Sequence, residues 1–103
     1  MGIFYMSYSP GPWRTERNFH HDRLNLRSKE REYFIGSIFR DERGSDISVE
    51  EGDANAHLIA AAPEMLAALK SVLDDNRLMN AMSKEQARLI MDAVTKAEVV
   101  KYE

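Results

Sequence analysis

Three patterns in the sequence predict an α+β fold, in which a small N-terminal antiparallel β-sheet of two to four strands packs against a C-terminal helical hairpin of two or three helices. Apolar and polar residues alternate with a period near two within residues 13–39. From Ser48 onward, apolar residues recur at helical spacing behind two capping motifs. Neither the apolar face of a sheet nor the apolar stripe of a helix is stable in water, so each is expected to cover the other.

Chain length and proline placement set the expected domain organisation. A chain of 103 residues is long enough for one core but not for two independent ones. We therefore expect a single α+β domain over residues 13–103, with the sheet in 13–47 and the helices in 48–103. Residues 1–12 contain Pro10 and Pro12, which cannot donate backbone hydrogen bonds. This segment is expected to be an extended lead-in, with order beginning at Trp13.

Two segments are expected to form strands. Leu24 and Leu26 alternate with polar residues, and a polar connector at residues 28–31 separates them from residues 33–39. The second segment is apolar on both faces, which is typical of a central strand or of a strand covered by a helix on one side and by a partner chain on the other. A turn is expected at residues 41–44, where glycine permits positive φ.

The first two helices are expected to meet at a proline. Ser48 and Glu51 have the spacing of a capping box, so the first helix is expected to begin at Ser48. Pro63 is expected to end or kink that helix and to open the next one. The second helix carries the strongest predicted burial, along a stripe formed by Met65, Leu66, Leu69, Val72 and Leu73.

A third helix is expected after a loop over residues 74–82. It is expected to begin at Ser83, which forms a capping box with Gln86, and to run to about Glu98. Its apolar stripe is expected to face that of the second helix. Because so small a core leaves a modest margin over chain entropy, we expect the chain to form a homo-oligomer. The residues of this third stripe are Leu89, Ile90, Ala93, Val94 and Ala97.

Composition narrows the possible functions. The chain has no cysteine, which excludes disulfides, thiolate catalysis and thiolate metal sites and favours a reducing cytoplasm. The net charge of −3 provides no overall attraction to a polyanion. The longest apolar run is too short to span a bilayer, and the N-terminal residues lack the basic and apolar regions of a secretory signal. We therefore expect a cytoplasmic protein with no membrane role.

Three sequence elements resemble those of known proteins. Residues 9–13 read SPGPW, residues 55–66 read NAHLIAAAPEML, and residues 96–98 read KAE. In these elements the chain resembles a widespread group of small bacteriophage and prophage accessory proteins that carry an N-terminal SPGPW element and an NAxLIAAAPELL segment. The resemblance implies a phage accessory protein made in the cytoplasm of a host bacterium. It carries over no catalytic residue, because the recurring positions are apolar, small or proline.

The histidines do not form a convincing metal or catalytic motif. His20, His21 and Asp22 are consecutive, so on an extended chain the histidines point to opposite faces, whereas a metal site needs three or four converging ligands. His57 has no Ser, Cys or carboxylate partner at catalytic spacing and is expected to be a boundary residue. We therefore expect no cofactor, no bound metal and no enzymatic activity.

Arginines concentrated in residues 14–43 provide the candidate binding site. On alternating strands they are expected to share a face with aromatic residues, a surface that suits a phosphate, a nucleotide or an acidic protein. A solvated sheet face is the competing interpretation. Trp13 is either a stacking or interface anchor or a cap on the core. The candidate partner-binding residues are Trp13, Arg14, Arg27, Arg31, Tyr33 and Arg40.

Three classes of function fit these observations. The leading hypothesis is a non-enzymatic phage accessory protein that inhibits a host antiviral-defence protein or sequesters a small anionic, nucleotide-like ligand made by the host. The alternative is a small nucleic-acid-binding factor that uses the arginine-rich half, for which affinity should fall steeply with salt. A third is a small virion or assembly component, which should copurify with particles.

Overall fold

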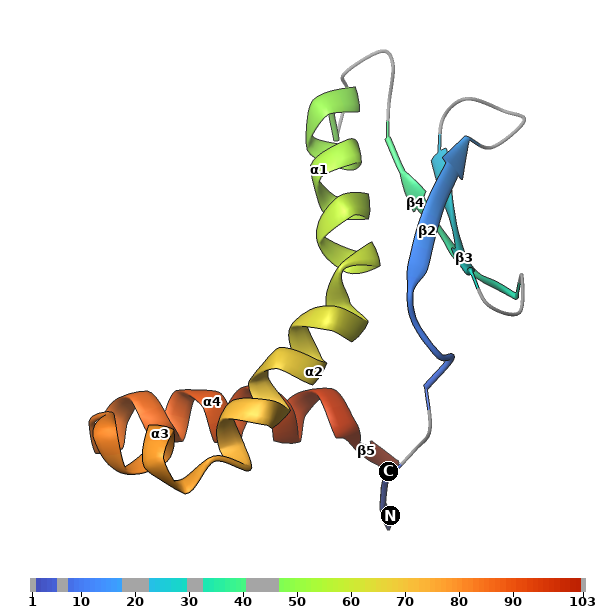
Figure 1. Ribbon diagram of the computed structural model, residues 1–103. Coiled ribbons are helices and arrows are strands. Elements are labelled where there is room, and N and C mark those ends of the chain that lie inside the picture. The colour runs from blue at the N-terminus through green and yellow to red at the C-terminus, as the bar shows by residue number, and fades with distance from the viewer. Residues whose placement is uncertain (1, 6–7, 18–22, 30–32, 41–46, 103) are drawn as a thin grey trace. The chain divides into compact units, whose positions relative to one another are not determined.

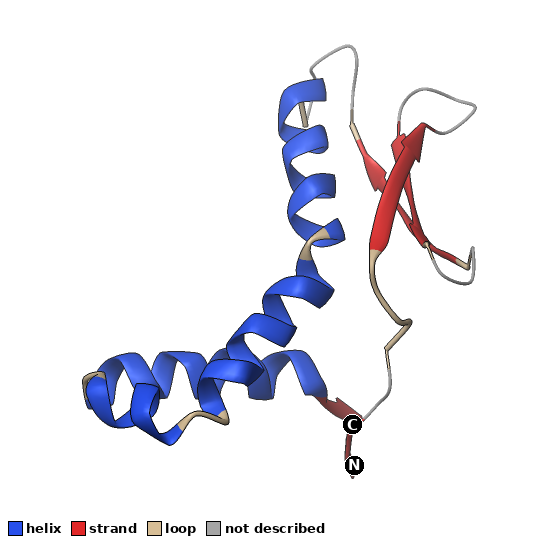
Figure 2. Cartoon of the chain, viewed as in Figure 1, coloured by secondary structure: helices blue, strands red, loops and turns tan. Residues whose placement is uncertain are grey.

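The computed structural model describes residues 2–5, 8–17, 23–29, 33–40 and 47–102 (Figure 1). A three-stranded antiparallel sheet precedes the helices, as the sequence predicts, so the α+β fold class is confirmed (Figure 2). The chain divides into two compact units, which we call the sheet unit (Ser9–Glu64) and the helical unit (Met1–Tyr8 with Met65–Glu103). The prediction of a single domain stays a prediction. The elements are β1 (Gly2–Tyr5), β2 (Trp13–Arg17), β3 (Arg23–Ser28), β4 (Phe34–Phe39), α1 (Val49–Ala60), α2 (Ala62–Leu73), α3 (Asn76–Ala81), α4 (Lys84–Glu98) and β5 (Val99–Tyr102).

The sheet unit is built on an antiparallel three-stranded sheet in the order β2-β3-β4. Arg14 of β2 lies opposite Arg27 of β3, and Leu24 of β3 lies opposite Ile38 of β4. The register shifts at a bulge next to Leu26, so one residue of β4 has no direct partner there. A backbone hydrogen bond from Ser28 N to the carbonyl oxygen of Tyr33, 2.8 Å long, joins the ends of β3 and β4.

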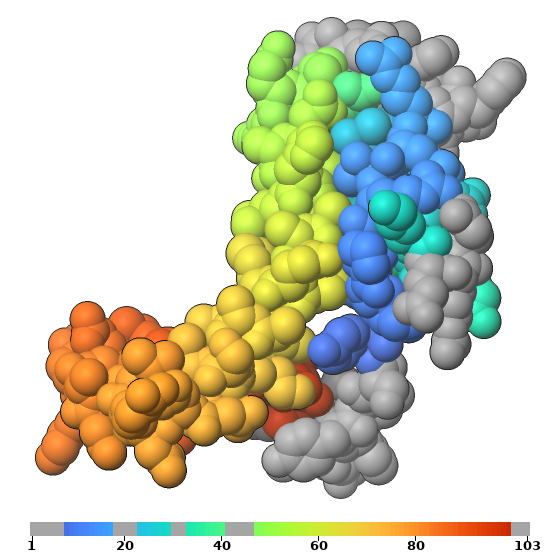
Figure 3. All heavy atoms as spheres, viewed as in Figure 1, coloured from blue at the N-terminus to red at the C-terminus, as the bar shows by residue number. Residues whose placement is uncertain are grey.

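Helix α1 packs against one face of this sheet and contacts all three strands (Figures 1 and 3). The core between them contains Leu24 and Leu26 from β3 and Ala56 from α1. The approach is close at Gly52, where an added Cβ would collide with Arg40 and lie 2.9 Å from the carbonyl oxygen of Phe39. Small residues on the inner side of α1 therefore set how near the helix comes to β4.

The ends of α1 confirm two predictions from the sequence. The Ser48 side chain caps the helix by accepting a hydrogen bond of 3.1 Å from the backbone N–H of Glu51. Helix α1 ends at Ala60 and α2 begins at Ala62, so the interruption at Ala61 lies two residues before Pro63. Proline suits the first turn of a helix because the N–H groups there lack intrahelical acceptors.

The SPGPW segment packs within the sheet unit against the start of α2. An added Cβ on Gly11 would lie 2.7 Å from the Cβ of Pro63, so these backbones meet where glycine leaves room. The peptide bond before Pro12 is cis. Ser28 Oγ donates to the carbonyl oxygen of Pro10 at 2.8 Å, and Lys29 N donates to that of Pro12 at 2.9 Å. The SPGPW and NAHLIAAAPEML elements of the sequence resemblance thus both have structural roles at one contact.

The helical unit contains a second, two-stranded sheet that the sequence did not predict. Strands β1 and β5 pair antiparallel, with Gly2 opposite Tyr102 and Tyr5 opposite Val99. This differs from the expectation that order begins at Trp13. Strand β5 was missed because it follows α4 directly, with no turn residue to mark the end of the helix.

The prediction of a loop over residues 74–82 is wrong, because α3 occupies most of it. Asp75 caps this short helix by accepting from the backbone N–H groups of Arg77, at 2.9 Å, and Leu78, at 3.3 Å. None of the residues of α3 is buried, so this helix lacks the apolar stripe on which the prediction of helices depended. Its cap was the available signal in the sequence.

The apolar stripes of α2 and α4 are buried in part. Leu66 of α2 and Val94 of α4 are buried, and an ion pair of 3.0 Å joins Lys70 to Glu98 across the two helices. Leu89 differs from the prediction, since it is 62% exposed. Among the described residues, no single helix is long and apolar enough to cross a membrane, although α1 and α2 together pass that test as a bent pair.

Candidate functional site

The face of the β2-β3-β4 sheet that points away from α1 carries most of the polar and aromatic side chains of these three strands, and we call it the open face. Its membership follows from strand alternation together with the side-chain contacts described below. It is accessible, because Phe34 and Phe39 are 57% and 44% exposed. The open face consists of Arg14, Glu16, Arg23, Asn25, Arg27, Phe34, Ser37 and Phe39.

An arginine–glutamate–arginine cluster lies at the centre of the open face. Arg14 Nη1 donates to Glu16 Oε2 at 2.8 Å, and Arg27 Nε donates to Glu16 Oε1. These two hydrogen bonds, that from Arg27 first and that from Arg14 second, lower the pKa of Glu16 below its ordinary value of 4.5. The carboxylate therefore holds two guanidinium groups in fixed positions, although each of the three side chains is about one-third exposed to water.

Aromatic and neutral polar groups extend this cluster towards β4. The guanidinium of Arg27 lies over the ring of Phe34, 5.7 Å from its centroid, which is a cation–π distance. Ser37 Oγ donates to Asn25 Oδ1 at 2.9 Å. Phe39 lies opposite Arg23 in the register of the sheet. The open face thus offers an apolar edge along β4 and a charged centre along β2 and β3.

Arg40 does not belong to the open face, in contrast to the expectation that it would project with Arg27 and Arg31. It is buried at 7% exposure and forms an ion pair of 3.0 Å with Asp53 of α1. Its Nε has no hydrogen-bond partner within the described part of the chain. Gly52 makes room for it, because a side chain there would collide with Arg40. Arg31 lies outside the described residues.

Trp13 and Tyr33 lie at the margins of the sheet. Trp13 is half-buried, and its indole N–H donates to the carbonyl oxygen of Ser9 at 2.9 Å. Strand alternation places it on the α1 side, opposite Ser28, and this position agrees with the interpretation of Trp13 as a cap on the core. Tyr33 is 53% exposed and directly precedes β4. The centre of the open face is therefore formed by arginines, and Trp13 does not contribute to it.

The described histidine does not take part in a cluster. His57 is exposed on α1, and no group of three potential metal ligands occurs within the described ranges. His20, His21 and Asp22 lie outside those ranges. The described residues therefore provide no set of converging ligands for a metal site.

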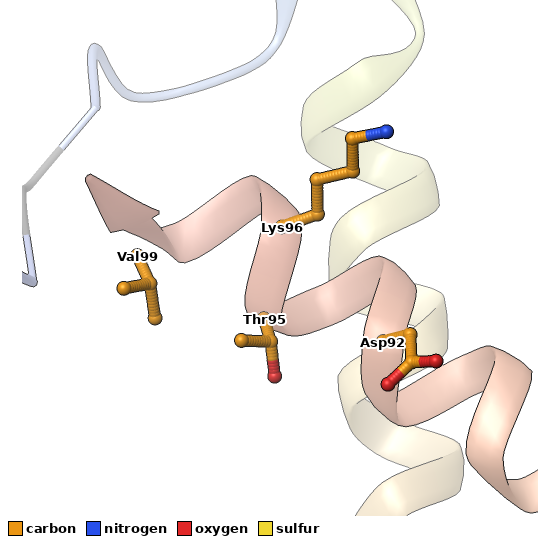
Figure 4. Close-up of a pocket in the computed structure, with 4 residues that line it drawn as sticks. All are labelled: Asp92, Thr95, Lys96 and Val99. Atoms are coloured by element: carbon orange, nitrogen blue, oxygen red, sulfur yellow. The ribbon is translucent and has the colours of Figure 1, made fainter. Parts of the chain in front are cut away.

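Two surface hollows lie on α4, and the first includes two residues of the stripe that was predicted to be buried. One, of about 370 Å³, is lined by Met82, Gln86, Leu89 and Ile90. The other, of about 480 Å³, is lined by Asp92, Thr95, Lys96 and Val99 (Figure 4). In Figure 4 Lys96 extends from one side of α4, while Asp92 and Thr95 extend from another. Because these polar groups do not converge, the hollow lacks the geometry of a catalytic site.

The chain matches the family described as Salmonella phage P22 protein Y8K6, over residues 1–101. The chain belongs to this phage family. The match supports the sequence resemblance at the level of a small phage protein and does not test the individual motifs. Comparisons with curated proteins and with solved structures gave no match.

Proposed function

We propose that this phage protein is a non-enzymatic binding protein that inhibits a protein of the host bacterium by contacting it through the open face of the sheet. The observation that carries the proposal is the Arg14–Glu16–Arg27 cluster beside exposed Phe34. Arginine and aromatic residues dominate the energetics of protein–protein interfaces. An interface that combines both on one sheet face therefore has the chemistry of a recognition surface.

The ion pairs on the open face support binding by reducing its entropic cost. A free arginine side chain loses considerable rotamer freedom when a partner immobilises it. Glu16 already holds Arg14 and Arg27 by hydrogen bonds, and Arg27 also lies over Phe34. The cluster is thus partly ordered before any partner arrives. A carboxylate on the partner would then meet guanidinium groups in place rather than mobile ones.

A protein partner fits the open face better than a small anionic ligand. Small-molecule sites are concave and bury most of the ligand. The open face gives little such enclosure, because Phe34 and Phe39 are exposed and the side chains of the arginine–glutamate–arginine cluster are each about one-third exposed. In addition, Glu16 contributes a negative charge between Arg14 and Arg27 that a small anion would have to displace. A protein surface meets the same Glu16, but its apolar groups can also cover Phe34 and Phe39, which a small anion cannot.

Nucleic acid is the second candidate, because exposed aromatic rings and arginines on an antiparallel sheet also suit unstacked bases. The ring of Phe34 is accessible, and Arg27 adjoins it. Binding of this kind must weaken steeply as salt rises. Titration of the purified protein with single-stranded DNA and RNA at low and high salt tests it, and no binding at low salt would eliminate this candidate.

The test of the main proposal is a comparison of two double variants with equal charge change. Arg14→Ala/Arg27→Ala removes both cations of the open face. Arg77→Ala/Arg88→Ala removes two exposed arginines from α3 and α4 and is the matched control. Host proteins retained by the wild-type protein are identified, purified and titrated against all three proteins, after circular dichroism has shown that each variant is folded.

We expect the open-face variant to bind the purified host protein at least about tenfold more weakly than the wild type, since buried charged hydrogen bonds each contribute more than a tenfold factor. The control variant should bind like the wild type. Equal weakening by both variants would indicate a general charge effect and contradict the proposal. Turnover of a substrate by the purified phage protein would contradict its non-enzymatic part.

A further inference from the structure

Within the described residues, strand β4 is an edge strand without the protection that edge strands normally carry. In the part of the chain that the structure describes, β4 pairs on one side, with β3, and β2 forms the opposite edge. The β2 sequence, WRTER, contains three charged residues and follows Pro12. The β4 sequence, FIGSIF, contains no charge and no proline. Charges and prolines are the usual devices that prevent edge-to-edge pairing, so β2 is protected against it and β4 is not.

The sequence of β4 is also nearly the same when read in reverse. From Phe34 it reads phenylalanine, isoleucine, glycine, serine, isoleucine, phenylalanine, and the central glycine–serine pair alone changes order on reversal. With Ile35 and Gly36 sharing one position at the bulge, two such strands that pair antiparallel about Ser37 place each Phe34 opposite the Phe39 of the second copy, and each Ile35 opposite its Ile38. Opposite residues in antiparallel strands lie on the same face and contact each other.

The pattern of exposure along β4 agrees with this pairing. Phe34, Ser37 and Phe39 are exposed, whereas Ile35 and Ile38 are half-buried. The exposed phenylalanines would therefore meet each other on one face, and the isoleucines would meet on the face that α1 covers. The bulge in β4 accounts for this symmetry, because the extra residue there lets Phe34 and Phe39, five positions apart, lie on the same face.

We propose that two copies of this protein associate through β4, antiparallel and with Phe34 opposite Phe39 of the second copy, to form a continuous six-stranded sheet. The two-fold axis is perpendicular to the sheet, so both α1 helices lie on one side and both open faces on the other. Strand β4, which the sequence predicts to be apolar on both faces, then lies at the centre of the six-stranded sheet. The dimer presents two Arg14–Glu16–Arg27 clusters on one surface.

The size of the contact sets the expected strength of the dimer. A single pair of six-residue strands buries less area than the interfaces of roughly 1,200–2,000 Å² that characterise stable complexes. The dimer is therefore reversible and dissociates on dilution. Sedimentation velocity over a concentration series should show a shift from the 11.8 kDa monomer towards twice that mass.

Charge substitutions at the two phenylalanines test the pairing and its register together. In the proposed register, the variant Phe34→Lys/Phe39→Glu places opposite charges across both outer pairs. The variant Phe34→Lys/Phe39→Lys places like charges there. Both replace the same exposed rings, so they differ in the sign of one charge. Like charges directly opposite each other in a sheet are destabilising, whereas opposite charges are stabilising.

We expect the dimer of the Lys/Lys variant to dissociate at a concentration at least about tenfold higher than the dimer of the Lys/Glu variant, because the charge effect acts at two pairs. Equal dimerisation of the two variants would overturn the proposed register. A wild-type protein that stays monomeric at every concentration would overturn the dimer itself. A wild-type protein that forms the dimer but binds no host protein would contradict the proposed function and leave the dimer supported.

Hydrogen exchange of the wild-type protein provides a measurement that needs no folded variant. The backbone N–H groups at the outer edge of β4 should exchange more slowly as the protein concentration rises, because the second copy accepts their hydrogen bonds. Those at the outer edge of β2 should not change. Equal protection at both edges, or none at β4, would overturn the proposal.

Discussion

The arginines of the sheet unit show how neighbours decide what a residue does. Arg27 lies on the accessible face, between Glu16 and Phe34, whereas Arg40 is buried against Asp53. Strand alternation predicts the position of Arg27 from the sequence. It cannot predict that of Arg40, because this residue follows the end of β4 and its burial depends on the absent side chain of Gly52 on another element. Of these two arginines, Arg27 therefore had a local signal in the sequence and Arg40 did not.

The titration of Glu16 tests the ion-pair cluster at the level of one residue. Its folded pKa lies below 4.5 because Arg27 and Arg14 donate hydrogen bonds to the charged form. Between the folded and unfolded pKa values the native state binds fewer protons than the unfolded state, so stability rises with pH in that window. The contribution is complete above the unfolded pKa and is lost as pH falls through the folded one.

NMR titration of the Glu16 carboxyl carbon should accordingly give a midpoint below 4.5 in the wild-type protein. In Arg27→Gln the midpoint should rise, because the hydrogen bond that lowers the pKa of Glu16 most is removed. Arg77→Gln, a change at a 93% exposed side chain on α3, is the control and should leave the midpoint where it was. An unchanged midpoint in Arg27→Gln would show that this cluster does not persist in solution.

At the level of elements, the sequence predicted those boundaries that short-range chemistry sets. Ser48 and Ser83 cap helices as expected, and the break before Pro63 follows from the missing N–H of proline. The boundaries of β1 and β5, which it missed, depend on partners distant in sequence. Strand β5 exists through pairing with β1, and neither has enough residues for a clear alternation of its own.

The capping box of α4 makes a measurable contribution to stability. Ser83 Oγ accepts from Gln86 N at 3.1 Å, and Gln86 Oε1 accepts from Ser83 N at 3.0 Å. Ser83→Ala removes the first bond and should lower the free energy of unfolding by about 1 kcal/mol, as measured by urea denaturation. Ser71→Ala is the control, because Ser71 Oγ bonds back to the carbonyl oxygen of Ala68 within α2. It should be neutral or slightly stabilising, since alanine is the better helix former.

At the level of the whole molecule, the described residues contain two small groups of buried apolar side chains. In the sheet unit these are Leu24, Leu26 and Ala56, and in the helical unit they are Leu66 and Val94. Large apolar side chains such as Leu58 and Leu89 remain 61% and 62% exposed. Within the described residues, this burial gives each unit a narrow margin of stability, which is the condition under which association with a second copy or a host protein contributes most.

Truncation of one leucine in each unit tests whether the units unfold together. Leu26→Ala and Leu66→Ala each remove a buried side chain, at 3% and 9% exposure, and should each cost about 3 kcal/mol locally. If the units are separate cooperative structures, Leu26→Ala should speed the amide exchange of β3 and α1 and leave that of α4 unchanged, and Leu66→Ala should do the reverse. The continuous helix α2, which contains the boundary between Glu64 and Met65, is the element through which the units could be coupled. Equal acceleration of exchange in both units by either variant would show that α2 joins them into one cooperative structure, and hydrogen exchange monitored by NMR distinguishes the two results residue by residue.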